Sequence, residues 1–406
     1  MSSPLPALLA AALLTGICIT ELAANEASTT DLFLSLPGPK EIAGQVNEAL
    51  FTLQEGHEKE GMAALDAILH GDKATEQQKA TTLILRAAWF DAKDRRENAL
   101  ADSETALELA DLPPDMRAFI LCNRAGRLEE WNRKDEAIAD YTRVVQTKGV
   151  SDRWLANACL LRGLALGDEG KMAEASFSFS SVILLKNPPP HVLASAYSRR
   201  AFIRAEKGDA EGALNDCEKV LAIQKAPPDV VAEAYLTRAT VEMGTGRMKQ
   251  AVDDLTVAIG IPEIEPVKLA DALNNRGLIL AKTDDTRQAE ADFKRLADIP
   301  EASVALRAKA LVFHGTLQAN RGLKKEALQD YGRMLEMKDV PVDIVADGLG
   351  VRGLTEVDLG DREAARRDWE RGLKLKGLAG ETRAKFEHLL EKLRTTSDTS
   401  TEKQSQ

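Results

Sequence analysis

Histidines and cysteines are the residues of this chain whose side chains could bind a metal ion or act as nucleophiles. The chain contains five histidines and four cysteines. The histidines are scattered, and no two have the spacing of a metal site: His57, His70, His191, His314 and His388. Cys122, Cys159 and Cys217 lie far apart without a Cys-x-x-Cys spacing, which is typical of small buried residues. We therefore expect no metal, no cofactor and no catalytic residue in this chain.

One glycine-rich string fits the pattern of a dinucleotide-binding loop. It is Gly348-Leu349-Gly350-Val351-Arg352-Gly353, which matches G-x-G-x-x-G. That pattern needs a strand before it and a helix that opens after it. Here Arg352 and Gly353 belong to columns of an internal repeat and fall inside an expected helix, so the match is predicted to be accidental. No nucleophile elbow, phosphate loop or pair of catalytic carboxylates stands out, and the sequence predicts a protein without enzymatic activity.

Basic residues recur along the chain at an interval of 38 residues. We call the recurring residue the mark of its repeat: Arg86, Arg124, Arg162, Arg200, Arg238, Arg276, His314 and Arg352, with Glu48 in a degenerate first copy. An aspartate stands sixteen residues after most marks: Asp102, Asp140, Asp216, Asp254, Asp292, Asp330 and Asp368. Opposite charges at a constant spacing predict one structural ion pair per repeat, with His314 as a structural substitute. The spacing leaves open whether each partner lies in the same repeat or in the next one.

Turn-forming and small residues keep the same interval and predict two helices per repeat, A and B. Gly, Asn or Asp stands eight residues after each mark, as at Gly208, and tolerates the left-handed backbone that follows helix A. Ala or Gly stands one residue and thirteen residues after the mark, and from the second copy on Ala stands six residues before it. Small side chains at these three positions allow helices to pack closely. Prolines fall 24 to 28 residues after a mark, where the next helix A begins. Around Arg200, we expect helix A from Pro190 to Lys207 and helix B from Glu211 to Gln224.

Composition limits the class of partner. The 406 residues carry a net charge of -11, and the sequence pI is about 5.2. A protein that binds the phosphate backbone needs a basic face, so the charge disfavours nucleic acid. Hydrophobic residues make up 44% of the chain and aromatic residues only 4%. The apolar mass is therefore aliphatic and suits helices packed on small residues.

The two ends of the chain differ from its middle. Pro4 to Thr20 form an apolar run that is too short to span a bilayer comfortably and resembles the core of a secretory signal peptide. We expect residues 1–24 to be a signal peptide or hydrophobic leader, which favours export to the periplasm or the outside over the alternative of a cytoplasmic protein with a hydrophobic leading helix. Residues 25–40 are expected to be a linker. Residues 395–406 are expected to be a disordered tail.

The repeat columns resemble the tetratricopeptide repeat. The small residue after the mark, the turn residue seven further on and the alanine five beyond it match the spacing of that family. Its aromatic position is matched by Tyr141, Phe179, Phe293, Tyr331 and Trp369. The family repeat has 34 residues and this one has 38. The resemblance implies an all-α fold, a right-handed α-solenoid of antiparallel helix pairs, with nine repeats over residues 41–380 and a capping helix over 381–394.

The resemblance also implies a function and a site. Proteins of this family are scaffolds that bind peptides or protein surfaces in a groove lined by the A helices. The implied groove positions lie five and two residues before the mark, and two and five after it: Phe119, Cys122, Glu129, Asn157, Leu160, Leu164, Ser198, Phe202, Glu233, Leu236, Thr240, Asp271, Asn274 and Leu278. The groove is apolar in its middle copies and acidic toward Asp271 and Asp347, which favours an extended, partly apolar or basic partner. The alternatives are an RNA-binding helical-repeat protein, which the acidic charge disfavours, and a regulatory subunit of an enzyme complex.

Overall fold

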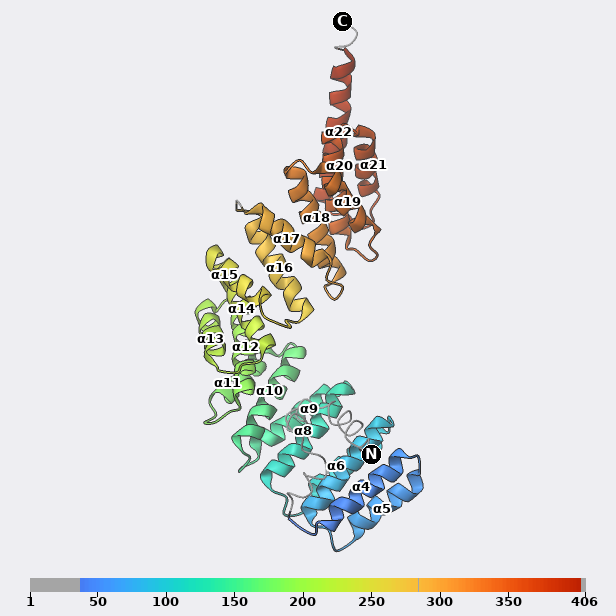
Figure 1. The fold of residues 1–406 in the computed structure, drawn as a ribbon, viewed down its shortest axis with the longest axis vertical. Coiled ribbons are helices and arrows are strands. Elements are labelled where there is room, and N and C mark those ends of the chain that lie inside the picture. The colour runs from blue at the N-terminus through green and yellow to red at the C-terminus, as the bar shows by residue number, and fades with distance from the viewer. Residues whose placement is uncertain (1–36, 284, 403–406) are drawn as a thin grey trace. The chain divides into compact units, whose positions relative to one another are not determined.

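The structure is a computed structural model that describes residues 37–283 and 285–402, with side chains described as far as residue 395. All regular elements in these ranges are α-helices, and there are nineteen of them. Figure 1 shows them as a succession of short antiparallel helices. The predicted all-α fold of helix pairs is confirmed.

The helices alternate between the two predicted types. The A helices are α4 (Glu41–Gln54), α6 (Glu76–Ala92), α8 (Pro114–Glu130), α10 (Asp152–Asp168), α12 (Pro190–Glu206), α14 (Pro228–Gly244), α16 (Pro266–Leu280), α18 (Val304–Asn320) and α20 (Val342–Asp358). The B helices are α5 (Glu58–His70), α7 (Arg96–Glu108), α9 (Lys134–Gln146), α11 (Met172–Ile183), α13 (Ala210–Ala222), α15 (Met248–Ile259), α17 (Thr286–Ala297), α19 (Lys324–Glu336) and α21 (Arg362–Leu373). A last helix, α22, spans Gly380–Glu402. The helices expected around Arg200 are confirmed to within two residues by α12 and α13.

The chain divides into two compact units. The first comprises the residues up to Ile203 together with Ile223–Lys225, and the second comprises Arg204–Ala222 and the residues from Ala226 on. Within each unit, consecutive helices pack against each other, as α8, α9 and α10 do in the first and α18, α19 and α20 in the second. Successive A helices also contact each other, for example α8 with α10 and α18 with α20. Each unit is therefore built by stacking helix hairpins that could not bury their apolar sides alone.

The turn after each A helix has the left-handed backbone that the sequence predicts. The residues eight after the mark have positive φ angles at all described positions: Gly56, Asp94, Asn132, Gly170, Gly208, Gly246, Gly322 and Gly360. The ninth, Asp284, lies outside the described residues. At the other end of the A helices, Pro114, Pro190, Pro228 and Pro266 are the first helical residues, where their missing N–H groups cost nothing.

Replacing Gly208 with valine tests this turn. Gly208 has a φ of 78°, and a Cβ atom there would meet no other atom within 4 Å. The cost of a side chain is therefore that of the left-handed backbone alone, and we expect Gly208→Val to lower the free energy of unfolding by about 1–2 kcal/mol. Gly208→Asn is the matched control, because Asn132 occupies the same turn with a φ of 59°. Urea unfolding followed by circular dichroism should place the asparagine variant close to wild type, and equal midpoints for the two variants would contradict this account.

The columns of small residues are the places where helices touch most closely. In the first unit, Ala118, Ala125 and Ala137 are each at most 1% exposed. In four repeats glycine stands one residue after the mark and faces a large ring on the B helix, whereas repeat three keeps Ala125 in the repeat that carries Tyr141. A Cβ atom on any of these glycines would lie within 3 Å of that ring, in the pairs Gly163 with Phe179, Gly277 with Phe293, Gly315 with Tyr331 and Gly353 with Trp369. In these four repeats, the missing side chain of the glycine makes room for the ring.

The predicted ion pairs form within one repeat and also reach the preceding one. Arg276 donates Nε and Nη2 to the two carboxylate oxygens of Asp292 at 2.8 and 2.6 Å. Its Nη1 donates to Thr256 Oγ1 at 3.0 Å, on the B helix of the preceding repeat. Arg86 makes the same contacts with Asp102 and with Asp66. The arginine column therefore ties three helices together.

In repeat five, Asp216 contacts Arg204, four residues after the mark, at 2.9 Å. Two further copies also vary the pair. His314 Nδ1 lies 2.7 Å from Asp330 Oδ2, which confirms His314 as the structural substitute for arginine. Arg162 donates instead to the Ser178 hydroxyl at 3.1 Å, because the fourth copy lacks the aspartate. Most of the buried carboxylates of the chain therefore face a cation from the same helix pair.

The second unit ends in helix α22. Phe386 is 1% exposed, and a Cβ atom on Gly372 would overlap its ring, so α22 covers the last helix pair as a cap. The helix begins at Gly380, one residue before the predicted start, and continues to Glu402 through residues expected to be a tail. A helix that starts from a packed segment can extend at little cost. The predicted leader, most of the predicted linker and Cys18 lie outside the described residues.

Candidate functional site

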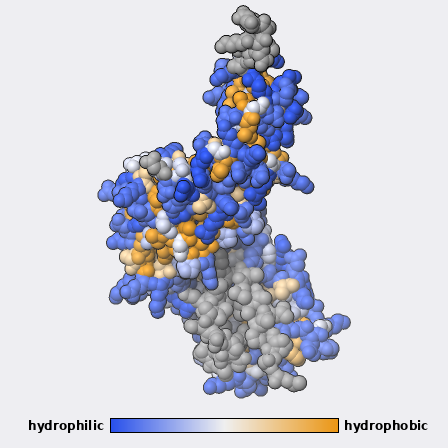
Figure 2. Space-filling model, turned by 45° about the horizontal axis from the view of Figure 1, so that its top comes forward, coloured by the Kyte–Doolittle hydropathy of each residue, from blue (hydrophilic) through white to orange (hydrophobic). Residues whose placement is uncertain are grey.

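The predicted groove corresponds to one side of the A helices, which we call the A-helix face. It consists of the four columns that lie five and two residues before the mark and two and five after it. Contacts between successive A helices, such as α8 with α10 and α18 with α20, bring parts of these columns next to each other within each unit. Figure 2 shows that hydrophilic residues cover most of the visible surface and that apolar residues reach it in patches.

In the first unit, the A-helix face is largely apolar. The ring of Phe119 meets the ring of Trp154 edge to face, with centroids 5.6 Å apart. Leu160 and Leu164 are half-buried and pack along the same unit's hydrophobic core. Phe202, on α12, is 46% exposed. An exposed ring among half-buried leucines is a surface that can bury apolar groups of a partner.

Not every predicted groove residue of the first unit is available to a partner. Cys122 and Ser198 are only 2% and 1% exposed, so their side chains lie beneath the surface. Glu129 accepts a hydrogen bond from the Tyr141 hydroxyl at 2.9 Å, and burial raises the pKa of its carboxyl. Asn157 is half-buried on α10. The contact surface of this unit is therefore made by Phe119, the two leucines and Phe202.

In the second unit, the A-helix face is more polar. Thr240 is exposed, although its hydroxyl donates to the Leu236 carbonyl at 2.9 Å. The Asn274 side chain donates to the Asn275 side-chain oxygen at 3.2 Å. These hydrogen bonds within the chain use part of the donors and acceptors that Thr240 and Asn274 could otherwise offer to a partner. Leu236 and Leu278 are half-buried. The column five before the mark carries Glu233, Asp271, Lys309 and Asp347 in this unit, so three of its four residues are acidic.

Two carboxylates of the second unit are unusual on this face. Asp271 and Asp347 lie at the surface, but neighbouring atoms shield their carboxyl groups from part of the solvent. This partial burial raises the pKa of both carboxyls. Neither forms a hydrogen bond or an ion pair with another residue in the described part of the chain, although Lys385 and Lys309 oppose the shift at Asp347. Leu354, seven residues after Asp347 on α20, is 44% exposed. A partly desolvated anion beside an exposed leucine would be stabilised by a cation with an apolar stem.

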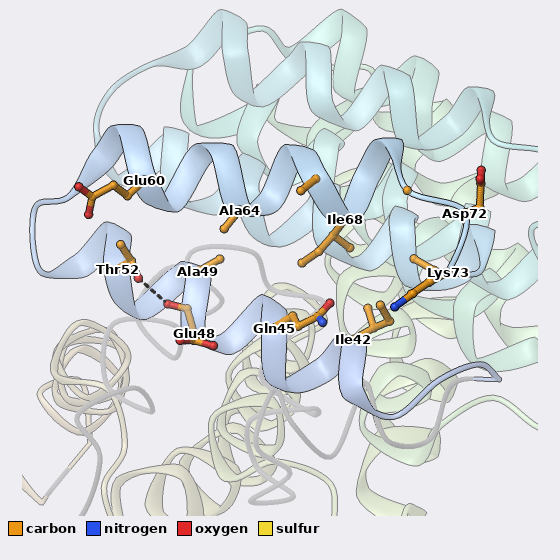
Figure 3. Close-up of a pocket in the computed structure, with 13 residues that line it drawn as sticks. Ile42, Gln45, Glu48, Ala49, Thr52, Glu60, Ala64, Ile68, Asp72 and Lys73 are labelled. Atoms are coloured by element: carbon orange, nitrogen blue, oxygen red, sulfur yellow. Dashed lines mark hydrogen bonds between the residues drawn. The ribbon is translucent and has the colours of Figure 1, made fainter.

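A separate pocket of about 860 Å³ lies on the first helix pair. Figure 3 shows that residues of α4 and α5 line it, with Ile42, Ala49 and Ile68 between the two helices. Its rim carries Glu48 and Glu60. The residues that line the pocket belong to columns that pack on the preceding repeat elsewhere in the chain. The described residues before α4 do not form another repeat.

Residue types in the pocket fit the end of an array. Gln45 is exposed, whereas Leu83 and Leu121 stand in the same column of the next two repeats and are buried. Glu48 replaces the arginine of the later marks and is likewise exposed. Terminal repeats need such polar outer faces to stay soluble. The pocket lies on the first described helix pair, and we take the A-helix face, which recurs along both units, as the candidate site.

The described residues offer little for catalysis. No three His, Cys, Asp or Glu side chains in the described ranges are grouped so that they could hold a metal ion. Cys122, Cys159 and Cys217 are buried free thiols, as predicted, and burial raises the pKa of Cys217 to about 12. The glycine string at Gly348 lies in the middle of α20, far from any helix start. In the part of the chain that the structure covers, no helix has the length and apolar character needed to cross a membrane.

Comparisons with known proteins bear on the architecture. No protein-family model matches the chain, and no curated protein matches its sequence. The solved structure of the apo form of RapI matches with a TM-score of 0.52 at 13% identity, over 86% of this chain and 98% of its own. A tetratricopeptide repeat protein from Parabacteroides merdae matches with a TM-score of 0.44 at 18% identity, over 68% of this chain and 99% of its own. The C-terminal part of a TPR repeat-containing protein from Cytophaga hutchinsonii matches with a TM-score of 0.49 at 13% identity, over 64% and 97%.

The chain has the fold of a tetratricopeptide-repeat protein. The small–turn–alanine spacing therefore led to the correct architecture, in spite of the longer repeat. Within this tetratricopeptide-type fold, each unit presents its A helices as one surface, apolar in the first unit and acidic with leucines in the second.

Proposed function

We propose that this tetratricopeptide-type chain is a non-enzymatic scaffold that binds a protein segment on its A-helix face. The observation that carries the proposal is the pair Asp271 and Asp347 in the second unit. Both carboxyls are partly desolvated without a bonding partner in the described chain, and Leu354 is exposed on the same face. Groups that lose hydration without gaining a partner are typical of a surface that another molecule completes.

The chemistry of the face defines the partner. In the second unit, the carboxylates of Glu233, Asp271 and Asp347 and the leucines of the same face suit an extended segment that carries Lys or Arg between apolar residues, with Lys309 as the one cation in the acidic column. In the first unit, Phe119, Leu164 and Phe202 suit apolar side chains. Because the side chains stand on packed helices, little conformational entropy is lost by the scaffold on binding. A basic, partly apolar segment is therefore the preferred ligand class.

Selection of peptides from a random displayed library against the purified full chain tests this proposal. We expect the selected peptides to be enriched in Lys or Arg spaced by apolar residues and to bind less tightly as salt is raised. Asp271→Asn together with Asp347→Asn should weaken their binding by about tenfold, which corresponds to about 1.4 kcal/mol. The matched control is Asp253→Asn, because Asp253 is an exposed carboxylate on helix B of the same unit.

Two results would count against the proposal. One is a set of selected peptides without basic residues. The other is binding that the Asp271→Asn, Asp347→Asn variant leaves unchanged while Asp253→Asn reduces it, which would place the binding surface on the B helices.

A further inference from the structure

Helix α11 carries the two most exposed large apolar side chains among the described residues. Phe177 is 71% exposed and Leu184, the residue that follows the helix, is 84% exposed. They are seven residues apart, which places them on the same side of the helix, two turns from each other. This side faces away from the packed residues of α11, such as Phe179, whose ring contacts Gly163 of α10. The two side chains are therefore presented to solvent.

The same columns are polar or small in all the other repeats. Fifteen residues after the mark, where repeat four has Phe177, the others have Ala63, Ala101, Ala139, Asn215, Asp253, Ala291, Gln329 and Arg367. Twenty-two residues after it, where repeat four has Leu184, they have His70, Glu108, Gln146, Ala222, Gly260, Asp298, Glu336 and Lys374. Two solvent columns have thus become apolar in one repeat only, which the packing of the fold does not require.

Charge has been removed from this helix as well. Residues 175–185 contain no Asp, Glu, Lys or Arg. In the column nineteen residues after the mark, repeat four has Ser181 and repeat six has Val257, whereas the other repeats from the third on carry Arg143, Lys219, Arg295, Arg333 and Arg371. In a chain with a net charge of -11, a helix whose one charged residue is Glu174 in its first turn is where two copies oppose few like charges. A second copy is therefore favoured over a basic or acidic partner.

The sequence of the face is complementary to itself. We call its five residues the α11 stripe: Ala173, Phe177, Ser180, Ser181 and Leu184. Small and large residues alternate along Ala173, Phe177, Ser180 and Leu184, and the Ser180 hydroxyl also accepts a hydrogen bond from Arg200 Nη1 at 3.1 Å. If two such helices pair antiparallel about a two-fold axis, Phe177 of one lies opposite Ser180 of the other, and Leu184 lies opposite Ala173. Each large side chain then meets a small one, as an isologous interface requires.

We propose that the α11 stripe is the site where two copies of this chain associate as an antiparallel, two-fold symmetric pair. One short helix per copy buries less than the roughly 800 Å² per partner of a standard stable interface, so the pair is weak and depends on concentration. The A helices take no part in this contact. The proposal therefore stands apart from the proposed function, and a failure of either leaves the other intact.

Sedimentation velocity of the full chain at about 1–200 μM tests the proposal. We expect a monomer–dimer equilibrium that persists or strengthens when salt is raised, because the contact is apolar and the copies repel elsewhere. Phe177→Asp should weaken the dimer at least tenfold. Ala139→Asp is the matched control, because Ala139 holds the same column one repeat earlier, and it should leave the dimer unchanged.

A charge rescue tests the geometry. Ala173→Glu and Leu184→Arg should each weaken the dimer, and the double variant should restore it, because the antiparallel pairing places residue 173 opposite residue 184. A chain that stays monomeric at all concentrations, association that survives Phe177→Asp, or a double variant no better than the singles would overturn the proposal. Circular dichroism of each exposed-site variant verifies that the helices are intact.

Discussion

Replacing Asp292 with alanine is expected to lower the stability of the second unit by about 3–5 kcal/mol. Arg276 and Asp292 are 8% and 3% exposed and form two parallel hydrogen bonds. Without the carboxylate, the positively charged guanidinium of Arg276 stays buried. Among the described residues, the Thr256 hydroxyl is then its remaining side-chain hydrogen-bond acceptor. Urea unfolding followed by circular dichroism, with hydrogen exchange of α16 and α17, measures the loss.

The matched control is an exposed pair of the same geometry. Arg133 donates Nε and Nη2 to the two oxygens of Glu136 at 2.6 and 2.7 Å, but both side chains face solvent. We expect Glu136→Ala to have no measurable effect, since water replaces the lost contact. The double variant Arg276→Met, Asp292→Leu should recover much of the stability, because the buried charge is removed with its partner. Equal unfolding midpoints for Asp292→Ala and Glu136→Ala would contradict the assignment of a buried pair.

The helix pairs could be predicted because their limits are chemically marked. Pro190 begins α12 and Gly208 follows it in the left-handed region, so steric rules alone locate both ends. The alanine columns then identify the packed sides. None of this requires knowledge of neighbouring repeats, since each constraint acts on a few consecutive residues.

The partner of each mark arginine could not be predicted in the same way. A guanidinium has donors enough for two acceptors, and Arg86 uses them on Asp102 of its own repeat and on Asp66 of the preceding one. Spacing alone cannot separate these contacts, because both depend on how far the side chain reaches between helices. By contrast, the match between Gly353 and the Trp369 ring was visible in the sequence as paired columns of small and large residues.

The candidate site could be predicted only as a set of columns. Leu160 and Ser198 stand in the same column, yet the leucine is half-buried and the serine is 1% exposed. The neighbouring side chains cover a short side chain such as serine, whereas a long one such as leucine extends beyond them. The exposure of a residue in this column therefore depends on the side chains around it. The unpaired state of Asp271 also required coordinates. The α11 stripe did not require coordinates, because comparing the exposed positions of the B helices across the repeats is enough to single out Phe177 and Leu184.

Helix α20 carries a buried carboxylate that the repeat does not need. Glu356 stands four residues after the mark Arg352, and its side chain is 12% exposed. Arg352 is already bonded to both oxygens of Asp368, and one oxygen of Glu356 has no hydrogen-bond partner among the described residues. Burial, together with the charge of Asp368, raises the pKa of Glu356 to about 7.

The raised pKa of Glu356 contributes a cost to folding at neutral pH that is absent in mild acid. Below about pH 4.5, Glu356 is protonated in both the folded and the unfolded chain and costs nothing. As the pH rises from about 4.5 to 7, the unfolded chain releases the proton first, so folding becomes less favourable. A pKa difference of this size corresponds to at most about 3 kcal/mol, fully present above pH 7.

Replacing Glu356 with glutamine is therefore expected to stabilise the protein by about 2–3 kcal/mol at pH 8 and to have little effect at pH 4.5. Glutamine fits the position, because Gln318 occupies the same column in the preceding repeat. Urea unfolding at both pH values measures the difference, and Glu363→Gln, an exposed change on α21, serves as the control. A gain that is the same at both pH values would mean that glutamine acts through packing, whereas a loss at pH 8 would mean that the ionised carboxylate of Glu356 stabilises the fold.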